Sequence, residues 1–140
     1  MSDLGLTRYL GYAELGPAQA LKDVLAEEQA QALAHGIHLI AVQSADSTLV
    51  VGDSHHYGET PPPFAPADVE QLILDEFHAV LDMPQARVCE RWTGIYPSAA
   101  DRLMFVDAPE PNVRIVMITS GTGASTSFAI AEEVIASLCE

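Results

Sequence analysis

The sequence predicts an α+β fold, an antiparallel or mixed β-sheet covered by helices, in a single domain over residues 1–140. β-rich segments outnumber helical ones, and the helices lie between hairpin-like groups instead of after every strand, which disfavours a parallel sheet. The chain also ends in a strand, a glycine turn and a helix. Its length and its hydrophobic fraction of 49% are sufficient for a buried core.

The first half predicts one strand, one helix and one hairpin. Leu6 to Leu15 is aromatic and β-favouring, and Pro17 suits the first turn of a helix. That helix has apolar residues near helical spacing and ends at about His35, because Gly36 follows. Two β-rich runs around a polar turn then predict a hairpin of 37–43 and 48–52.

The second half begins with a proline-stiffened loop, 53–65, and a helix that opens at Pro66 and ends before Pro84. Its remaining predicted elements are strands at Arg87–Tyr96, Leu103–Asp107 and Val113–Ile118 and a helix at about Thr122–Leu138. Trp92 is expected to be a core aromatic residue. The last helix is expected to bury Phe128, Ile130, Val134, Ile135 and Leu138.

The net charge and the hydropathy of the sequence limit the classes of partner that the chain is expected to bind. A net charge of −14 repels phosphate backbones and anionic lipids, so neither nucleic acid nor a membrane surface is an expected partner. No segment approaches the roughly 20 apolar residues that a membrane-spanning helix needs. Cys89 and Cys139 lack metal or disulfide spacing and are interpreted as reduced thiols, which favours the cytoplasm.

The strongest local motif is the strand, turn and helix start that contain Thr119-Ser120-Gly121-Thr122-Gly123-Ala124-Ser125-Thr126. Backbone N–H groups at a helix N-terminus can hold an electron-rich ligand edge, and Gly121 and Gly123 permit close approach because they lack a Cβ. An ordinary strand-to-helix turn, with Ser125 or Thr126 as the N-cap, is the alternative interpretation.

Further motifs extend this signal over almost the whole chain. Arg91-Trp92-Thr93-Gly94-Ile95-Tyr96-Pro97, then Asp101 and Phe105-Val106, together with Val50-Val51-Gly52-Asp53-Ser54-His55-His56-Tyr57-Gly58, resemble the D-amino-acid oxidase and glycine oxidase superfamily of FAD-dependent oxidoreductases. Within it, the chain is most similar to a bacterial subgroup associated with aminophosphonate breakdown.

The resemblance implies that the chain is the substrate-domain and C-terminal part of such an enzyme. The turn of Ser120, Gly121, Thr122, Gly123, Ala124 and Ser125 would then lie against the pyrimidine end of FAD. No early strand–GxGxxG–helix unit occurs in the sequence, so a Rossmann-type half is expected from elsewhere, in cis or as a separate chain. The chain alone is expected neither to retain FAD nor to be active.

The resemblance also implies a small anionic amine as substrate, either an amino acid or an aminophosphonate. Arg91, His55, Tyr57 and Tyr96 are the predicted substrate-binding residues, with Arg8 and His56 as further cationic candidates. Arg91 is the first choice because a guanidinium binds a carboxylate or phosphonate through two hydrogen bonds. Tyr96 replaces a basic residue of the better-known amino-acid oxidases, and the glycine turn has no base, so an unchanged α-amino-acid substrate is in doubt.

No catalytic residue is assigned, and no metal is expected. His55 and His56 are adjacent, so in an extended chain their side chains face opposite ways. A metal site formed by these two residues and Asp53 is therefore not supported by their spacing. Two non-enzymatic alternatives remain: a small-anion-binding domain, and an interaction module. In either case the apolar last helix is expected to drive a homodimer if nothing else covers it.

Overall fold

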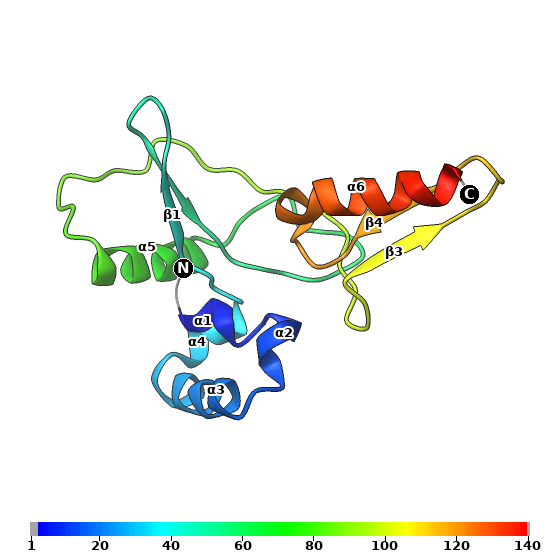
Figure 1. Ribbon diagram of the computed structural model, residues 1–140. Coiled ribbons are helices and arrows are strands. Elements are labelled where there is room, and N and C mark those ends of the chain that lie inside the picture. Colours follow the sequence, from blue (N-terminus) through cyan, green and yellow to red (C-terminus); the bar gives the residue numbers. More distant parts are fainter. Residues whose placement is uncertain (1–2, 140) are drawn as a thin grey trace. The chain divides into compact units, whose positions relative to one another are not determined.

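The computed structural model describes residues 3–139, which divide into two compact units between Arg91 and Trp92 (Figure 1). Each unit contains one antiparallel pair of strands together with helices. The α+β class is therefore confirmed, with the strands arranged as two separate two-stranded sheets. The prediction of a single domain stays a prediction, and each unit is described by itself.

The first unit opens with two short helices, α1 (Asp3–Leu6) and α2 (Leu10–Ala13). The prediction of a strand at Leu6–Leu15 is therefore wrong. The backbone satisfies its hydrogen bonds locally: the N–H groups of Tyr12 and Ala13 both donate to the carbonyl of Tyr9. Local turns thus override the β preference of the aromatic residues, which depends on a partner strand.

Helix α3 (Gly16–Glu28) carries its proline in the first turn, as predicted. The single predicted helix is interrupted at Gln29, which has a non-helical φ of −136°, and continues as α4 (Ala30–Ala34). Gly36 then ends the helical segment with a φ of +57°. This left-handed conformation is the reason that a glycine follows the helix.

The predicted hairpin is confirmed by β1 (Ile40–Gln43) and β2 (Leu49–Gly52), which pair antiparallel. Asp46 stabilises the turn because its carboxylate accepts hydrogen bonds from the backbone and the hydroxyl of Thr48. Reciprocal backbone hydrogen bonds between His38 and Asp53, of 2.9 and 3.0 Å, continue the pairing beyond the strands. The hairpin therefore brings the chain after β2 close to the chain before β1.

Helix α5 (Ala67–Val80) begins after Pro66, as predicted, and buries Val69 and Phe77. Its apolar stripe contributes to one core with the N-terminal helices and the start of the hairpin. The members of this core cluster are Leu4, Leu25, Ala32, Ile37 and Val69, with Leu21, Leu33, Leu72 and Ile73 packed against it.

The segment after α5 is irregular. The predicted strand at Arg87–Tyr96 is wrong: the structure describes every residue of this segment and assigns neither strand nor helix to it. A strand needs a neighbour for its hydrogen bonds, and the described strands pair only β1 with β2 and β3 with β4. Trp92 is 67% exposed, so its predicted place in a core is also wrong.

The second unit consists of β3 (Met104–Asp107), β4 (Ile115–Ile118) and α6 (Gly123–Cys139). Both strands and the helix lie close to their predicted positions. The prediction that α6 buries its apolar residues is wrong, because no residue of this fully described helix is buried and Phe128 is 90% exposed. A hairpin of four-residue strands is too small to cover a 17-residue helix.

Candidate functional site

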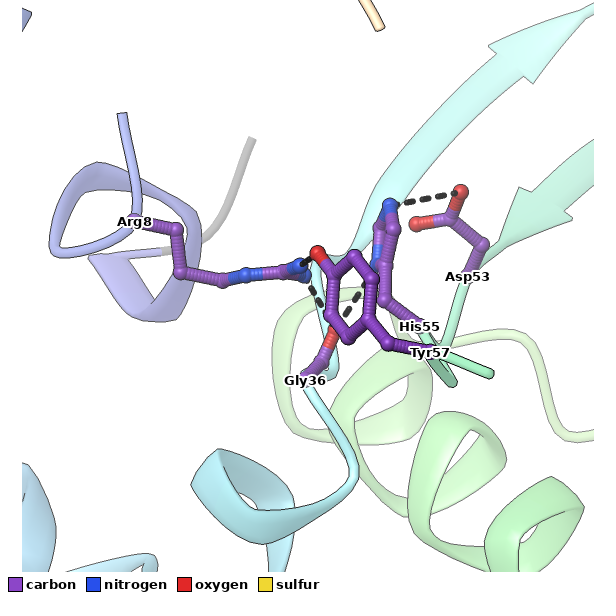
Figure 2. Close-up of polar contacts among 5 residues, drawn as sticks. All are labelled: Arg8, Gly36, Asp53, His55 and Tyr57. Carbon is purple, nitrogen blue, oxygen red and sulfur yellow. Dashed lines mark hydrogen bonds and ion pairs between the residues drawn. The ribbon is translucent and has the colours of Figure 1, made fainter. Parts of the chain in front are cut away.

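A polar cluster in the first unit joins three segments that are distant in sequence (Figure 2). Arg8 follows α1, Gly36 follows α4, and Asp53, His55 and Tyr57 belong to the segment after β2. The structure thus places two of the predicted substrate-binding residues, His55 and Tyr57, next to Arg8.

The carbonyl of Gly36 is the centre of this cluster. Arg8 donates to it from Nη1 at 2.8 Å, and Nδ1 of His55 lies 3.0 Å from the same oxygen. The other terminal nitrogen of Arg8 donates to the hydroxyl of Tyr57, and the guanidinium carbon lies 5.9 Å from the Tyr57 ring centroid. Figure 2 shows the guanidinium directed at both partners. Hydrogen bonds and a cation–π contact therefore fix the arginine head.

The two adjacent histidines have different surroundings, as expected for an extended chain. Nε2 of His55 lies 3.7 Å from the carboxylate of Asp53, and the His55 side chain is only 16% exposed. The ring of His56 instead lies against His35, with ring centroids 5.7 Å apart. His55 can therefore act together with Arg8 and Tyr57, whereas His56 faces other partners.

His38 pairs with Asp53 through the backbone and is buried, and its Nε2 has no hydrogen-bond partner among the described residues. Burial lowers its pKa because the charged form loses water, and the nearby charges of His55 and Arg8 act in the same direction. The carboxylate of Asp53 opposes them only partly. His38 is therefore a neutral packing residue near neutral pH.

Arg91, the first choice for the substrate anion, is already bound to a carboxylate. Its guanidinium donates to Glu70 of α5 through two nitrogens, at 2.5 and 2.6 Å. These hydrogen bonds hold the pKa of Glu70 below its ordinary value. No motif or spacing points to this partner, which lies 21 residues earlier on a helix. Glu70 thus occupies part of the Arg91 guanidinium and offsets the positive charge that it could offer to an external anion.

The second unit contains the predicted strand, glycine turn and helix. β4 ends at Ile118, and Thr119 is anchored to the segment before β3: its N–H donates to Leu103 and its hydroxyl to the carbonyl of Arg102. Gly121 has a φ of +74°, and α6 begins at Gly123. The turn is thus fixed at one end by strand contacts and at the other by the helix.

Tyr96 lies beside this turn. A Cβ built on Gly121 would lie 3.7 Å from the ring and hydroxyl of Tyr96, so the missing side chain leaves room for van der Waals contact. A Cβ on Gly123 would instead meet Ile118 at 3.4 Å. The structure therefore brings Tyr96 together with the predicted cofactor-binding turn, while Arg91, His55 and Tyr57 belong to the first unit.

Ser125 and Thr126 are not N-caps, so this detail of the alternative interpretation is wrong, whereas an ordinary strand-to-helix turn remains an open interpretation. Both lie inside the first turn of α6, and both hydroxyls donate back to the carbonyl of Thr122. The hydroxyl of Thr122 is paired with that of Ser120 at 2.7 Å. Among the described residues, the hydroxyls of Ser120, Thr122, Ser125 and Thr126 therefore bond to one another or to the Thr122 carbonyl and not to the first backbone N–H groups of α6.

The start of α6 presents backbone groups that could hold an anionic ligand edge. Gly121, Gly123 and Ala124 present backbone at the helix start, where the dipole favours negative charge. Ser120 and Thr122 are half-buried, whereas Gly121, Ala124 and Ser125 are exposed and accessible to a ligand.

Among residues 3–139, no three His, Cys, Asp or Glu side chains are placed to hold a metal ion. Within the same residues, none of the helices has the length and apolar character needed to cross a bilayer.

Comparison with known proteins gives one match. A family profile described as FAD dependent oxidoreductase (DAO) matches residues 9–137. No curated protein and no solved structure matches. Because the profile spans nearly the whole chain, including both the His55–Tyr57 segment and the glycine turn, this protein belongs to the FAD dependent oxidoreductase family.

Proposed function

We propose that this chain is the substrate-domain portion of an FAD-dependent oxidoreductase that oxidises a small anionic amine, an amino acid or an aminophosphonate, in the cytoplasm. The observation that carries the proposal is the strand–turn–helix with a left-handed Gly121 just before α6, in a chain of this family. The exposed apolar surface of the second unit supports a covering partner.

When bound, FAD would supply hydride acceptance from the carbon beside the amine. The backbone of Ser120 to Ser125 would hold and orient the pyrimidine end, and the α6 dipole would favour negative charge there. Tyr96 would limit the space beside Gly121. Arg91, His55 and Tyr57 would bind and orient the substrate anion, and Glu70 would compete with that anion for the Arg91 guanidinium.

The chain alone should not retain FAD. Contacts at a helix terminus contribute about 0.3–1 kcal/mol, whereas association costs on the order of 4–15 kcal/mol before other contacts offset it. A nucleotide-binding half, in cis or as a separate chain, would supply the remaining contacts. Stoichiometric flavin absorbance in the purified chain would contradict this part of the proposal.

The experiment is reconstitution with a nucleotide-binding half of this family, fused or mixed, followed by flavin spectra and amine oxidation. An aminoalkylphosphonate and an amino acid of the same carbon skeleton should be compared as substrates. Arg91→Ala should raise KM for the anionic amine, and Glu70→Gln should lower it because it releases Arg91. An assembly that binds FAD but oxidises neither amine would refute the proposed substrate class.

The exposed face of α6 also favours a second candidate, an interaction module that forms a homodimer. Phe128 and Ile135 are 90% and 61% exposed, and a two-fold dimer is the simplest way to cover such a helix. Light scattering at high protein concentration tests this directly. A monomer that binds a nucleotide-binding half would favour the enzyme portion, and a stable dimer that does not would favour the module.

A further inference from the structure

A pocket of about 340 Å³ lies in the first unit, beside the polar cluster of Figure 2. Leu4, Leu33 and Ile37 supply its apolar lining, and Arg8, Lys22 and Tyr57 contribute polar groups. Its volume lies at the lower end of the range for small-molecule sites, which are usually apolar with a few convergent polar groups. The pocket therefore suits a small molecule with one polar end.

The charge of this pocket is opposite to that of the chain. The sequence has six Lys and Arg residues against 20 Asp and Glu, yet two of those six line this pocket. Arg91 and Arg102 are paired with carboxylates. Within the described residues, Arg8 and Lys22 form no ion pair with a carboxylate, and the hydrogen bonds of Arg8 go to neutral oxygens. Among the described side chains, no carboxylate is ion-paired with the positive charge of this pocket.

The head of Arg8 is held in position. The Gly36 carbonyl and the Tyr57 hydroxyl each accept one hydrogen bond from it, whereas a guanidinium has five N–H donors. A Cβ on Gly36 would lie 3.0 Å from Nη1 of Arg8, so the absence of a side chain at this position permits the close approach. The remaining donors are pre-oriented, which reduces the entropic cost of binding an anion.

We propose that this pocket binds the oxyanion group of a small organic molecule, with a short apolar chain against Leu33, the one of its three leucine and isoleucine lining residues that is not fully buried. Arg8 supplies a fixed hydrogen-bonding fork and Lys22 a second charge, so a dianionic group binds more tightly than a carboxylate. The site requires residues of the first unit alone and is independent of FAD.

The test is titration of the full chain with propylphosphonate and, separately, with butyrate, at a pH above the second pKa of the phosphonate. Calorimetry measures each affinity, and NMR shifts of the Gly36 and Tyr57 amides show where the ligand binds. Both ligands should saturate, with the phosphonate tighter. Lys22→Gln and Arg8→Gln should each weaken phosphonate binding about tenfold or more. The Lys22 variant changes an exposed side chain, so it stays informative if Arg8→Gln unfolds.

Arg87→Gln is the matched control, because it removes the same charge from an exposed residue outside the pocket. It should leave both affinities unchanged. Equal weakening by Arg87→Gln and Lys22→Gln would show a general charge effect and overturn the proposal. Absence of saturable binding, or full affinity in Lys22→Gln, would also overturn it. Since no flavin is needed, failure of FAD binding in the reconstituted assembly would leave this result intact.

Discussion

The two units use their apolar residues in opposite ways. In the first unit, helices and hairpin enclose a core in which Leu4, Leu25 and Ile37 are at most 2% exposed. In the second, Thr119 is the one residue that is buried among those described. The apolar residues of β3, β4 and α6 remain open to solvent. Similar hydrophobic patterns thus produce a core in one unit and an uncovered surface in the other, as expected for a segment that packs against a partner.

The largest expected effect tests this difference directly. Leu25→Ala should destabilise the chain by about 2–5 kcal/mol because it leaves a cavity in the core. Phe128→Ala removes a larger side chain that is 90% exposed, and should change stability by no more than about 0.5 kcal/mol. Urea unfolding followed by circular dichroism measures both. Comparable losses would mean that α6 is covered in solution and that the contrast between the units is wrong.

The next effect measures how closely the first unit is packed. A Cβ on Gly5 would lie 2.3 Å from the ring of His38, so Gly5→Ala should cost about 1–3 kcal/mol through overpacking. Gly11, in the neighbouring helix, has nothing within 4 Å of its Cβ position. Gly11→Ala should instead stabilise by about 0.4–1 kcal/mol, because it restricts the unfolded chain. The same urea titrations apply, and an unchanged midpoint in Gly5→Ala would show that His38 can move away.

In the second unit, the stability of the glycine turn should depend on the left-handed backbone conformation of Gly121. Gly121→Ala forces a side chain into a φ of +74° and should cost about 1–2 kcal/mol. Gly123→Ala places its Cβ 3.4 Å from Ile118, an ordinary contact, and should have a smaller effect. Hydrogen exchange at the Thr119 and Thr126 amides reports on the turn itself. If both variants exchange at the same rate, the left-handed conformation is not maintained in solution.

The smallest effect is a pH dependence that originates in the first unit. Burial lowers the pKa of His38 in the folded state, so the unfolded state binds more protons and stability rises with pH. This stability is complete above the ordinary histidine value of 6.5 and is lost as the pH falls through it toward the lowered folded value. Unfolding free energies across this window should slope upward, and His38→Gln should flatten the slope. An unchanged slope would assign the dependence to other groups.

Elements with a local cause were predictable from the sequence. Pro17, Gly36 and Pro66 mark helix boundaries through their backbone preferences, and the glycine turn after β4 lies where predicted. The strand predicted at Leu6–Leu15 failed because β propensity cannot reveal whether a partner strand exists. The same reason applies to Arg87–Tyr96. The predicted burial of α6 was wrong because the periodicity of apolar residues identifies an apolar face without showing what covers it.

The candidate site was less predictable, because its contacts join residues that are distant in sequence. His55, Tyr57 and Tyr96 could be named from the family motif. The neutral partners of Arg8, the ion pair of Arg91 with Glu70, and the place of Lys22 in a pocket depend on how helices meet. Sequence spacing carries no information about which helices and loops contact one another in the fold. Charge counts predicted an acidic chain but not the positive pocket in its first unit.

The Gly36 carbonyl also bears on the order in which the chain folds. It receives Arg8 from 28 residues away and His55 from 19, and Arg8 reaches Tyr57 across 49. The β3–β4 hairpin instead closes over the eight positions from Asp107 to Ile115. Loop closure costs more entropy as loops lengthen, and folding slows with the sequence separation of contacts. We therefore expect pulse-labelled hydrogen exchange to detect the hairpin before the amide of His55, with the Gly36 junction among the last contacts to form.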